Sequence, residues 1–384
     1  MRHDGHLDFV DALRGLALLG VVLVHTGQRV TELSPRTAEV TSYGAFGVHL
    51  FFVASAFTLF LSLHRRSRSE TRPTLNYFLR RVFRIAPLFW LAIPFYLVWN
   101  GAGPQYWAPH GITRMDVLAT AAFVNGWNPT AINSVVPGGW SIAVEMNFYL
   151  LVPFLFTRLT NLRRCLRFFI TCVAAQWALN AAMRPVFVRY LALDEQYLAD
   201  LMHTLWLPTQ LPVFAAGFAL YYVLAPHLAG ARRDTDQPSR HDRPSVGLLL
   251  ATGVAVLAQL RLAPSSTFAG SMFAILAGGL ALRPSRLLVN AATRYLGDIS
   301  YSGYLVHFAV LDVADRGIRH FGAVPRDPLM HLALLYVAVL VGTIIAATAT
   351  TRLIEEPARR LGRLLIASLE SKAGIRLAAA ASPS

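Results

Sequence analysis

Charged residues are scarce in this chain. They make up 15% of its 384 residues, whereas a soluble domain carries about 25%. Hydrophobic residues account for 55% of the sequence, and the mean hydropathy is +0.46. This balance argues against a soluble enzyme and indicates a chain that crosses a membrane several times.

Cysteines and familiar cofactor motifs are also scarce. Cys165 and Cys172 lie about two helical turns apart on one apolar segment, which is too far for a disulfide. The sequence has no metal-ligand spacing, no P-loop, no GxSxG elbow and no GxGxxG turn. It therefore predicts no metal site and no serine nucleophile.

A net charge of +14 would suggest a nucleic-acid partner if the protein were soluble. Here the basic residues cluster in short loops between apolar segments, so membrane topology explains them better. We therefore predict the lipid bilayer as a partner and no nucleic acid.

Membrane-spanning helices need roughly 20 mostly apolar residues, and about ten segments meet this requirement. These predicted spans are residues 9–27, 44–63, 85–101, 140–157, 168–183, 204–225, 246–260, 266–282, 295–314 and 331–351.

The loop charges orient these spans. With ten spans and a cytoplasmic N-terminus, the inside loops hold 25 Lys and Arg and the outside loops hold 9. Adding the short apolar segment 116–127 as a span changes the counts to 14 and 20, against the usual cytoplasmic excess. We therefore predict an all-α polytopic bundle in the inner (plasma) membrane with both termini cytoplasmic. Residues 102–139 would form an extracytoplasmic loop, and residues 231–245 a polar cytoplasmic linker.

Arg14 and His25 are the first polar pair at membrane depth. Eleven residues correspond to about three helical turns, so both side chains share one face about 16 Å apart. Asp11 lies one turn before Arg14 and can pair with it. Ionisable groups at such depth usually face a bundle interior and mark a site. The alternative is an arginine that snorkels inward and an interfacial histidine.

Glu145 is the only acid in the span that begins "WSIAVEMNFY". The predicted topology places it about as deep as His25, where a carboxylate could orient an imidazole. Ser141 is a candidate substrate-binding neighbour. Trp140 is another, and an interfacial anchor is the alternative for it. A structural ion pair is the alternative for Glu145.

A second polar helix face occurs in "SYSGYLVH" at residues 300–307. Tyr304 and His307 share a face because they lie three residues apart, and His307 falls in the outer half of its span. Ser300 and Tyr301 are further candidates for substrate contact. Helix-packing serines are the alternative for this segment.

Three arginines, Arg80, Arg81 and Arg84, crowd the inner end of the span that begins near residue 85. Paired guanidinium donors suit phosphates, although such arginines also serve as ordinary cytoplasmic anchors. The topology thus predicts an anionic donor on the cytoplasmic side and an acceptor on the other side.

The order of these motifs resembles the acyltransferase 3 family of integral membrane acyltransferases. The resemblance covers residues 7–360, which would form the membrane domain, and leaves residues 361–384 as a cytoplasmic tail. The motifs that carry it are "LDFVDALRGLALLGVVLVH", "GVHLFFVASAF", "RRVFRIAP", "WSIAVEMNFY", "LGDISYSGYLVH" and "IEEPARR".

The resemblance implies transfer of an acetyl or other acyl group, usually from acetyl-CoA or another acyl-CoA, to a hydroxyl of a sugar, an envelope glycan or a small molecule. It implies that Arg14 and His25 are the essential pair, and it also matches Glu145, the three arginines, Ser300, Tyr301 and His307. Three positions depart from the family pattern, namely His49, Ala56 and Met146.

The leading hypothesis makes His25 the general base, because an imidazole titrates near neutrality. Arg14 would hold the donor or the oxyanion, and Glu145 would support His25. A transient acyl-histidine is the mechanistic alternative. A proton-coupled transporter is the rival function, since intramembrane Arg, His and Glu also suit a carrier.

Overall fold

The computed structural model describes residues 7–230 and 266–381. Within these residues the chain forms helices and no β-strand. The predicted span 246–260 and the predicted linker 231–245 lie outside the described residues. The first helices are α1 (Asp8–Arg29), α2 (Pro35–Ser42), η1 (Tyr43–Phe46), α3 (Gly47–Arg66), α4 (Pro73–Asn100), α5 (Arg114–Ala121), η2 (Asn125–Trp127), α6 (Gly139–Arg158) and α7 (Leu162–Tyr190). They are followed by η3 (Leu193–Glu195), α8 (Gln196–Leu205), α9 (Leu207–Gly230), α11 (Ser266–Leu282), α12 (Ala291–Asp298), α13 (Ser300–His320), α14 (Pro328–Thr350), η5 (Thr351–Glu355) and α15 (Glu356–Ala381).

Seven helical stretches in the described part of the chain are long and apolar enough to cross a membrane. They contain α1, α3, α4, α6, α7, α9 and α14. The predicted all-α multi-pass membrane bundle is therefore confirmed. The predicted span 266–282 corresponds to α11, which is a shorter apolar helix of 17 residues.

Two further segments bear on the predicted spans, namely residues 295–314 and residues 116–127. The predicted span 295–314 overlaps α13, whose second half carries Asp312, Asp315, Arg316 and Arg319 and is less apolar for that reason. The segment 116–127, which the charge count excluded as a span, holds most of the eight-residue helix α5 and the three-residue helix η2.

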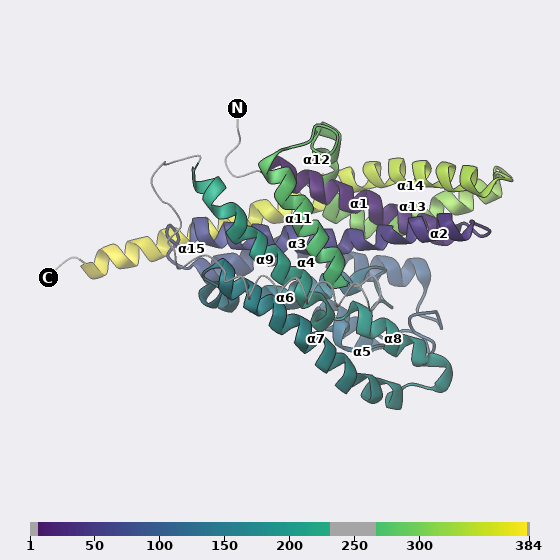
Figure 1. The fold of residues 1–384 in the computed structure, drawn as a ribbon, viewed down its shortest axis with the longest axis horizontal. Helices are drawn as coiled ribbons and strands as arrows, with labels where there is room; N and C mark the ends of the chain where they lie inside the picture. The colour runs from purple at the N-terminus through teal and green to yellow at the C-terminus, as the bar shows by residue number, and fades with distance from the viewer. Residues whose placement is uncertain (1–6, 231–265, 382–384) are drawn as a thin grey trace.

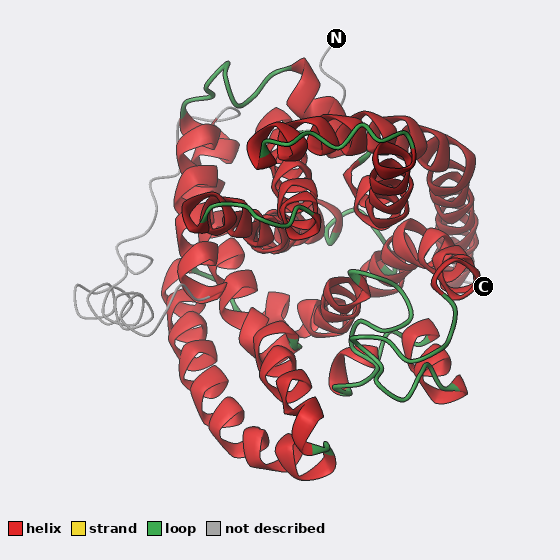
Figure 2. Cartoon of the chain, turned by 90° about the vertical axis from the view of Figure 1, so that its right-hand side faces the viewer, coloured by secondary structure: helices red, strands yellow, loops and turns green. Residues whose placement is uncertain are grey.

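Helices α1, α3, α14 and α15 run along the long axis of the molecule, whereas α7, α9 and α11 run obliquely to it (Figure 1), and several helices appear nearly end-on in the perpendicular view (Figure 2). The start of α1, the end of α9 and α15 gather at one end of the bundle, whereas α2 and the start of α14 lie at the other (Figure 1). The first of these ends is the one that the charge distribution predicts to be cytoplasmic.

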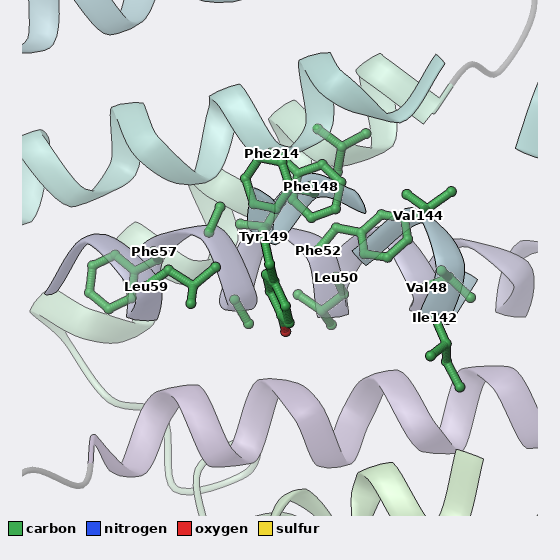
Figure 3. Packing of buried hydrophobic residues seen from close by; sticks show 14 of the residues in the cluster. Val48, Leu50, Phe52, Phe57, Leu59, Ile142, Val144, Phe148, Tyr149 and Phe214 are labelled. Carbon is green, nitrogen blue, oxygen red and sulfur yellow. The ribbon is translucent and has the colours of Figure 1, made fainter. Parts of the chain in front are cut away.

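Aromatic side chains fill the centre between α3, α6 and α9. The ring of Phe214 stacks on Phe148 at 3.7 Å and on Phe52 at 4.6 Å between centroids. Figure 3 shows this stack, with the Tyr149 hydroxyl pointing away from it. Because Phe148 and Tyr149 are neighbours on α6, one residue joins the apolar core and the next faces a polar site.

Two glycines allow α1 and α12 to cross at backbone distance. A Cβ atom on Gly15 would lie 2.0 Å from the Thr293 carbonyl oxygen, and one on Gly297 would lie 1.9 Å from the Asp11 carbonyl oxygen. Small residues permit such close helix packing in membranes. The crossing fixes α12 beside the first turns of α1.

Helix α15 is joined to the start of α4 by hydrogen bonds. The Glu370 carboxylate accepts hydrogen bonds from the backbone N–H groups of Thr71 (2.8 Å) and Arg72 (3.1 Å) and from the side-chain amide of Asn76 (2.7 Å). A carboxylate at a helix N-terminus also opposes the helix dipole favourably. The residues predicted as a tail thus include a helix that positions the arginine-bearing part of α4.

Candidate functional site

The described part of the bundle holds two adjoining cavities that share lining residues. The smaller, which we call the inner cavity, has a volume of about 60 Å³. The larger, which we call the vestibule, has a volume of about 1110 Å³ and is lined by residues from the cytoplasm-predicted ends of α1, α3 and α9, together with α12 and α15. The residues that line the inner cavity are Arg14, Val48, Phe51, Phe52, Ser55, Arg81, Arg84, Ile85, Ser141, Ile142, Glu145, Tyr149, Ser300, Tyr301 and Tyr304.

Arg14, Arg81 and Arg84 line both cavities and therefore mark their junction. Arg14 donates to the Asp11 carboxylate at 3.5 Å and to the Thr58 hydroxyl at 3.3 Å. The predicted Asp11–Arg14 pair is thus present. The structure also joins Arg14 to α3, through a threonine that the sequence interpretation did not single out.

Arg81 and Arg84 have guanidinium N–H groups that are free to bind a ligand. Within the described residues neither guanidinium donates a hydrogen bond, and the buried Nε of Arg81 has no partner. Arg81 lies over the ring of Tyr149, 5.8 Å from its centroid. Two half-buried guanidinium groups with free donors at a cavity junction suit an anionic ligand.

Arg80 faces a different partner. It donates to both carboxylate oxygens of Glu70, at 2.8 and 2.9 Å, and it lines neither cavity. Partial burial raises the pKa of Glu70, but the hydrogen bonds and charge of Arg80 outweigh it and hold that pKa below its ordinary value of 4.5. The structure therefore separates Arg80 from Arg81 and Arg84, with which the sequence grouped it.

Glu145 lines the inner cavity rather than lying beside His25. Its carboxylate accepts hydrogen bonds from Ser55 and Tyr149, both at 2.5 Å. Its charge acts on Arg14, Arg81 and Arg84. The predicted contact between Glu145 and His25 is absent, because the carboxylate points into the inner cavity and His25 lines neither cavity.

Helix α13 forms one wall of the inner cavity through Ser300, Tyr301 and Tyr304. The Tyr301 hydroxyl donates to the Ile85 carbonyl at 2.6 Å. The Tyr304 hydroxyl lies 2.7 Å from the Ser141 hydroxyl and donates to the Gly138 carbonyl at 3.1 Å. These bonds tie α13 to α4 and to the start of α6.

His25 and His307 lie together beyond this wall. Their ring centroids are 5.3 Å apart, and the ring of Phe308 lies 4.5 Å from that of His25. The Nδ1 atom of His307 is 2.7 Å from the Tyr304 carbonyl oxygen. A carbonyl only accepts, so Nδ1 carries the proton and Nε2 offers a lone pair; that Nε2 is buried and has no partner within the described residues.

Several other predicted residues lie outside both cavities. Trp140 packs edge-on against Phe52, with centroids 6.3 Å apart. Among the departures from the family pattern, His49 is buried beside Phe46, Ala56 is fully buried, and Met146 packs against the core. None of these four lines a cavity.

The vestibule carries a positive charge. Its lining includes six arginines and two aspartates, namely Arg14, Arg65, Arg66, Arg81, Arg84, Arg359, Asp11 and Asp298. Residues 7–230 and 266–381 contain no cluster of three or more His, Cys, Asp or Glu that could hold a metal. The excess of arginine over aspartate in its lining makes the vestibule suited to an anion.

Sequence reasoning did not identify Ser55 or Tyr149 as partners of Glu145. Tyr149 could have been found, because it follows Glu145 by four residues and so shares its helix face. Ser55 and the vestibule residues Arg65 and Arg359 belong to other helices, so only the packing of α3 and α15 brings them to the site.

Comparisons with known proteins agree with this architecture. The family model described as an acyltransferase domain matches residues 7–352. The chain is 28% identical over 342 residues to the exopolysaccharide production protein ExoZ of Rhizobium meliloti (strain 1021), covering 85% of this chain and 93% of that protein.

A second similarity is shorter. The chain is 27% identical over 173 residues to the O-acetyltransferase OatA of Staphylococcus aureus (strain NCTC 8325 / PS 47), covering 41% of this chain and 26% of that protein. No solved structure matches the chain significantly. The family match over nearly the whole described membrane domain confirms the resemblance seen in the sequence motifs: the chain belongs to the acyltransferase 3 family of integral membrane acyltransferases.

Proposed function

We propose that this membrane acyltransferase transfers an acyl group from acyl-CoA, bound from the cytoplasmic side, to a hydroxyl of a sugar acceptor. The observation that carries the proposal is the arginine-lined vestibule, which joins the inner cavity at Arg14, Arg81 and Arg84. Coenzyme A carries several phosphate groups, and guanidinium groups bind phosphates through charge and paired donors.

The acceptor side of the proposal draws on the relatives. One is named for exopolysaccharide production and the other is named an O-acetyltransferase. A sugar hydroxyl of an envelope polysaccharide or glycolipid is an acceptor consistent with both names. The charge distribution of the loops favours the inner (plasma) membrane orientation with both termini cytoplasmic.

His25 acts in this proposal as the general base. It takes the proton of the acceptor hydroxyl, whose oxygen attacks the thioester carbonyl, and the C–S bond breaks to release coenzyme A as its thiol. Arg14 stabilises the oxyanion from the cavity junction. Arg81 and Arg84 bind donor phosphates, whereas Arg80 holds Glu70.

Tyr304 lies between the two half-sites in this mechanism. It lines the inner cavity, its ring centroid is 5.8 Å from that of His307, and His307 contacts His25. Displacement of the Tyr304 hydroxyl from Ser141 opens a path between acyl group and acceptor. Glu145 balances the charge of the three junction arginines in place of orienting His25.

Inverted membrane vesicles that contain the full chain provide the test. Radiolabelled acetyl-CoA is added outside, which is the cytoplasmic face, and label in the glycan fraction is measured for wild type, His25→Ala and Arg84→Ala. We expect transfer by the wild type and loss in both variants. Proton-dependent solute uptake without any acyl transfer would support the transporter alternative.

A further inference from the structure

The vestibule has room for the nucleotide end of a donor such as coenzyme A. Its volume of about 1110 Å³ is about seven times that of a cavity of about 150 Å³, which holds benzene. The inner cavity, at about 60 Å³, is smaller than such a benzene site. Of these two cavities, only the vestibule can therefore hold an adenine ring, a ribose and their phosphate groups.

One face of α3 lines the vestibule from the junction to the cytoplasm-predicted end of the helix. The α3 residues on this face are Thr58, Leu61, Ser62 and Arg65. Thr58 accepts a hydrogen bond from Arg14 at the junction, at 3.3 Å. Arg65 follows Thr58 by seven residues, which is about 10 Å along the helix and returns to the same face. This face of α3 therefore begins at the arginines of the junction and ends at a further basic side chain.

Arg65 is not used by the fold. Within residues 7–230 and 266–381 it makes no hydrogen bond and no ion pair, whereas its neighbour Arg66 pairs with Glu70 at 3.4 Å. Its side chain is exposed and lines the vestibule. A phosphate monoester carries nearly two negative charges at neutral pH, and a guanidinium group binds it through charge and paired donors. Arg65 therefore suits a phosphate monoester.

Three rings lie beside Arg65 at the ends of α3 and α9. The ring of His64 is 6.2 Å from that of Tyr221, and Tyr221 is 5.0 Å from Tyr222, measured between centroids. All three residues line the vestibule, and the charge of Arg65 acts on Tyr221. Nucleobases pack against rings of this kind. The group therefore suits a base that is attached to the sugar carrying the phosphate.

We propose that Arg65 binds the 3′-phosphate of coenzyme A, and that His64 and Tyr221 contact its adenine ring. The inference rests on the proposed function, in which acyl-CoA is the donor and Arg81 and Arg84 bind phosphates at the junction. The ribose separates the 3′-phosphate from the pyrophosphate by about 7 Å, the length of about two extended residues. The junction and Arg65 are thus far enough apart to hold both phosphate sites at once.

The experiment compares radiolabelled acetyl-CoA with acetyl-dephospho-CoA, which lacks only the 3′-phosphate, in inverted vesicles that contain the full chain. The KM for each donor is measured for the wild type, Arg65→Ala, His64→Ala and Arg68→Ala. Arg68→Ala is the matched control, because it removes the same charge from an exposed arginine that lines neither cavity. The ratio of the two KM values does not depend on the amount of folded protein.

We expect the wild type to have a KM for acetyl-dephospho-CoA about tenfold or more above that for acetyl-CoA, because it loses a hydrogen bond between charged groups. Arg65→Ala should raise the KM for acetyl-CoA by about the same factor and leave that for acetyl-dephospho-CoA unchanged. His64→Ala should raise both KM values alike, by about fivefold or more, since both donors carry adenine. Arg68→Ala should retain the wild-type values.

Three results would overturn the inference while acyl transfer itself stands. They are equal KM values of the wild type for the two donors, an effect of Arg65→Ala that is the same for both donors, and an equal effect of Arg68→Ala and Arg65→Ala. An unchanged KM for both donors in His64→Ala would remove the adenine contact from the inference. Absence of label from either donor in the wild type would refute the proposed function and the inference with it.

Discussion

Glu70 accepts two hydrogen bonds from Arg80, at 2.8 and 2.9 Å, and thereby holds this arginine away from the two cavities. Glu70 also accepts a bond from Asn76, whose amide reaches Glu370 of α15 as well. The first turns of α4 are thus fixed by carboxylates on two sides. Of the three arginines near the start of this helix, Arg80 has a structural role, whereas Arg81 and Arg84 lie at the cavity junction.

The first prediction separates these roles by substitution. Arg84→Ala and Arg81→Ala should each raise the KM for acyl-CoA by about 10- to 150-fold, because a hydrogen bond to a charged group contributes about 1.5–3 kcal/mol. Arg80→Ala should leave that KM within about threefold, since the lost bonds involve Glu70, and should lower Tm instead. Initial rates in vesicles and thermal unfolding in detergent check both values. An equal rise in KM for Arg80→Ala would show that Arg80 binds the donor after all.

The second prediction concerns acid. Since the pKa of Glu70 is lower in the folded protein than its ordinary value of 4.5, the ionised form stabilises the fold. This contribution is complete above about pH 4.5 and is lost as the pH falls through the lowered pKa. The Tm of the wild type should therefore fall more steeply below pH 4.5 than that of Glu70→Gln, which lacks the titrating group. Parallel Tm curves for the two proteins between pH 7 and pH 3 would contradict the assignment.

The fold was largely predictable because its signals are local. Long apolar segments and the arginine bias of the loops do not depend on how helices pack, so the spans at α1, α3 and α4 followed from composition. Helix α13 was less clear, since Asp312 and Asp315 make its outer half polar. The brace between Glu370 and the start of α4 could not be predicted, because nearly 300 residues of sequence separate them.

Three of the predicted site residues share one cavity, but their pairings could not be predicted. Arg14, Glu145 and Tyr304 all line the inner cavity. Depth along the membrane placed Glu145 level with His25, but depth says nothing about which side of a helix faces which neighbour. The rotation of α6 decides this, since it turns Glu145 toward Ser55 and Tyr149.

The third prediction tests the position of Glu145. Two unit charges about 10 Å apart interact by about 1.7 kcal/mol at an effective dielectric constant of 20, so Glu145 should weaken binding of the anionic donor. Glu145→Gln should therefore bind coenzyme A about tenfold more tightly than the wild type, measured by calorimetry in detergent. Glu145→Asp keeps the charge and serves as the control. Weaker binding by Glu145→Gln would instead indicate that the carboxylate organises the donor site.

The fourth prediction concerns the helix crossing at Gly15. Gly15→Ala and Gly297→Ala each force a Cβ atom within about 2 Å of a backbone oxygen, and overpacking of this kind costs about 1–3 kcal/mol or more. Both variants should lower Tm in detergent. Gly317→Ala on α13 is the matched control, because its added Cβ meets no atom within 4 Å. It should be as stable as the wild type or slightly more stable, since alanine favours a helix over glycine. Equal Tm values for all three variants would show that α1 and α12 do not cross this closely.

The last prediction separates the chemical step from donor binding. His25 lies beside His307 and outside the vestibule, so its loss should leave the affinity for coenzyme A within about twofold while slowing acyl transfer by about 10²–10⁴-fold. Gln28→Ala is the informative control: Gln28 accepts from Nδ1 of His25 at 3.0 Å, and this bond keeps the lone pair on Nε2. Gln28→Ala should therefore reduce transfer less than His25→Ala does, with the same unchanged affinity. Both quantities are measured on one preparation of each protein. A folded His25→Ala variant that transfers acyl groups at the normal rate would rule out His25 as the base, and a variant that loses coenzyme A binding would place His25 on the donor side.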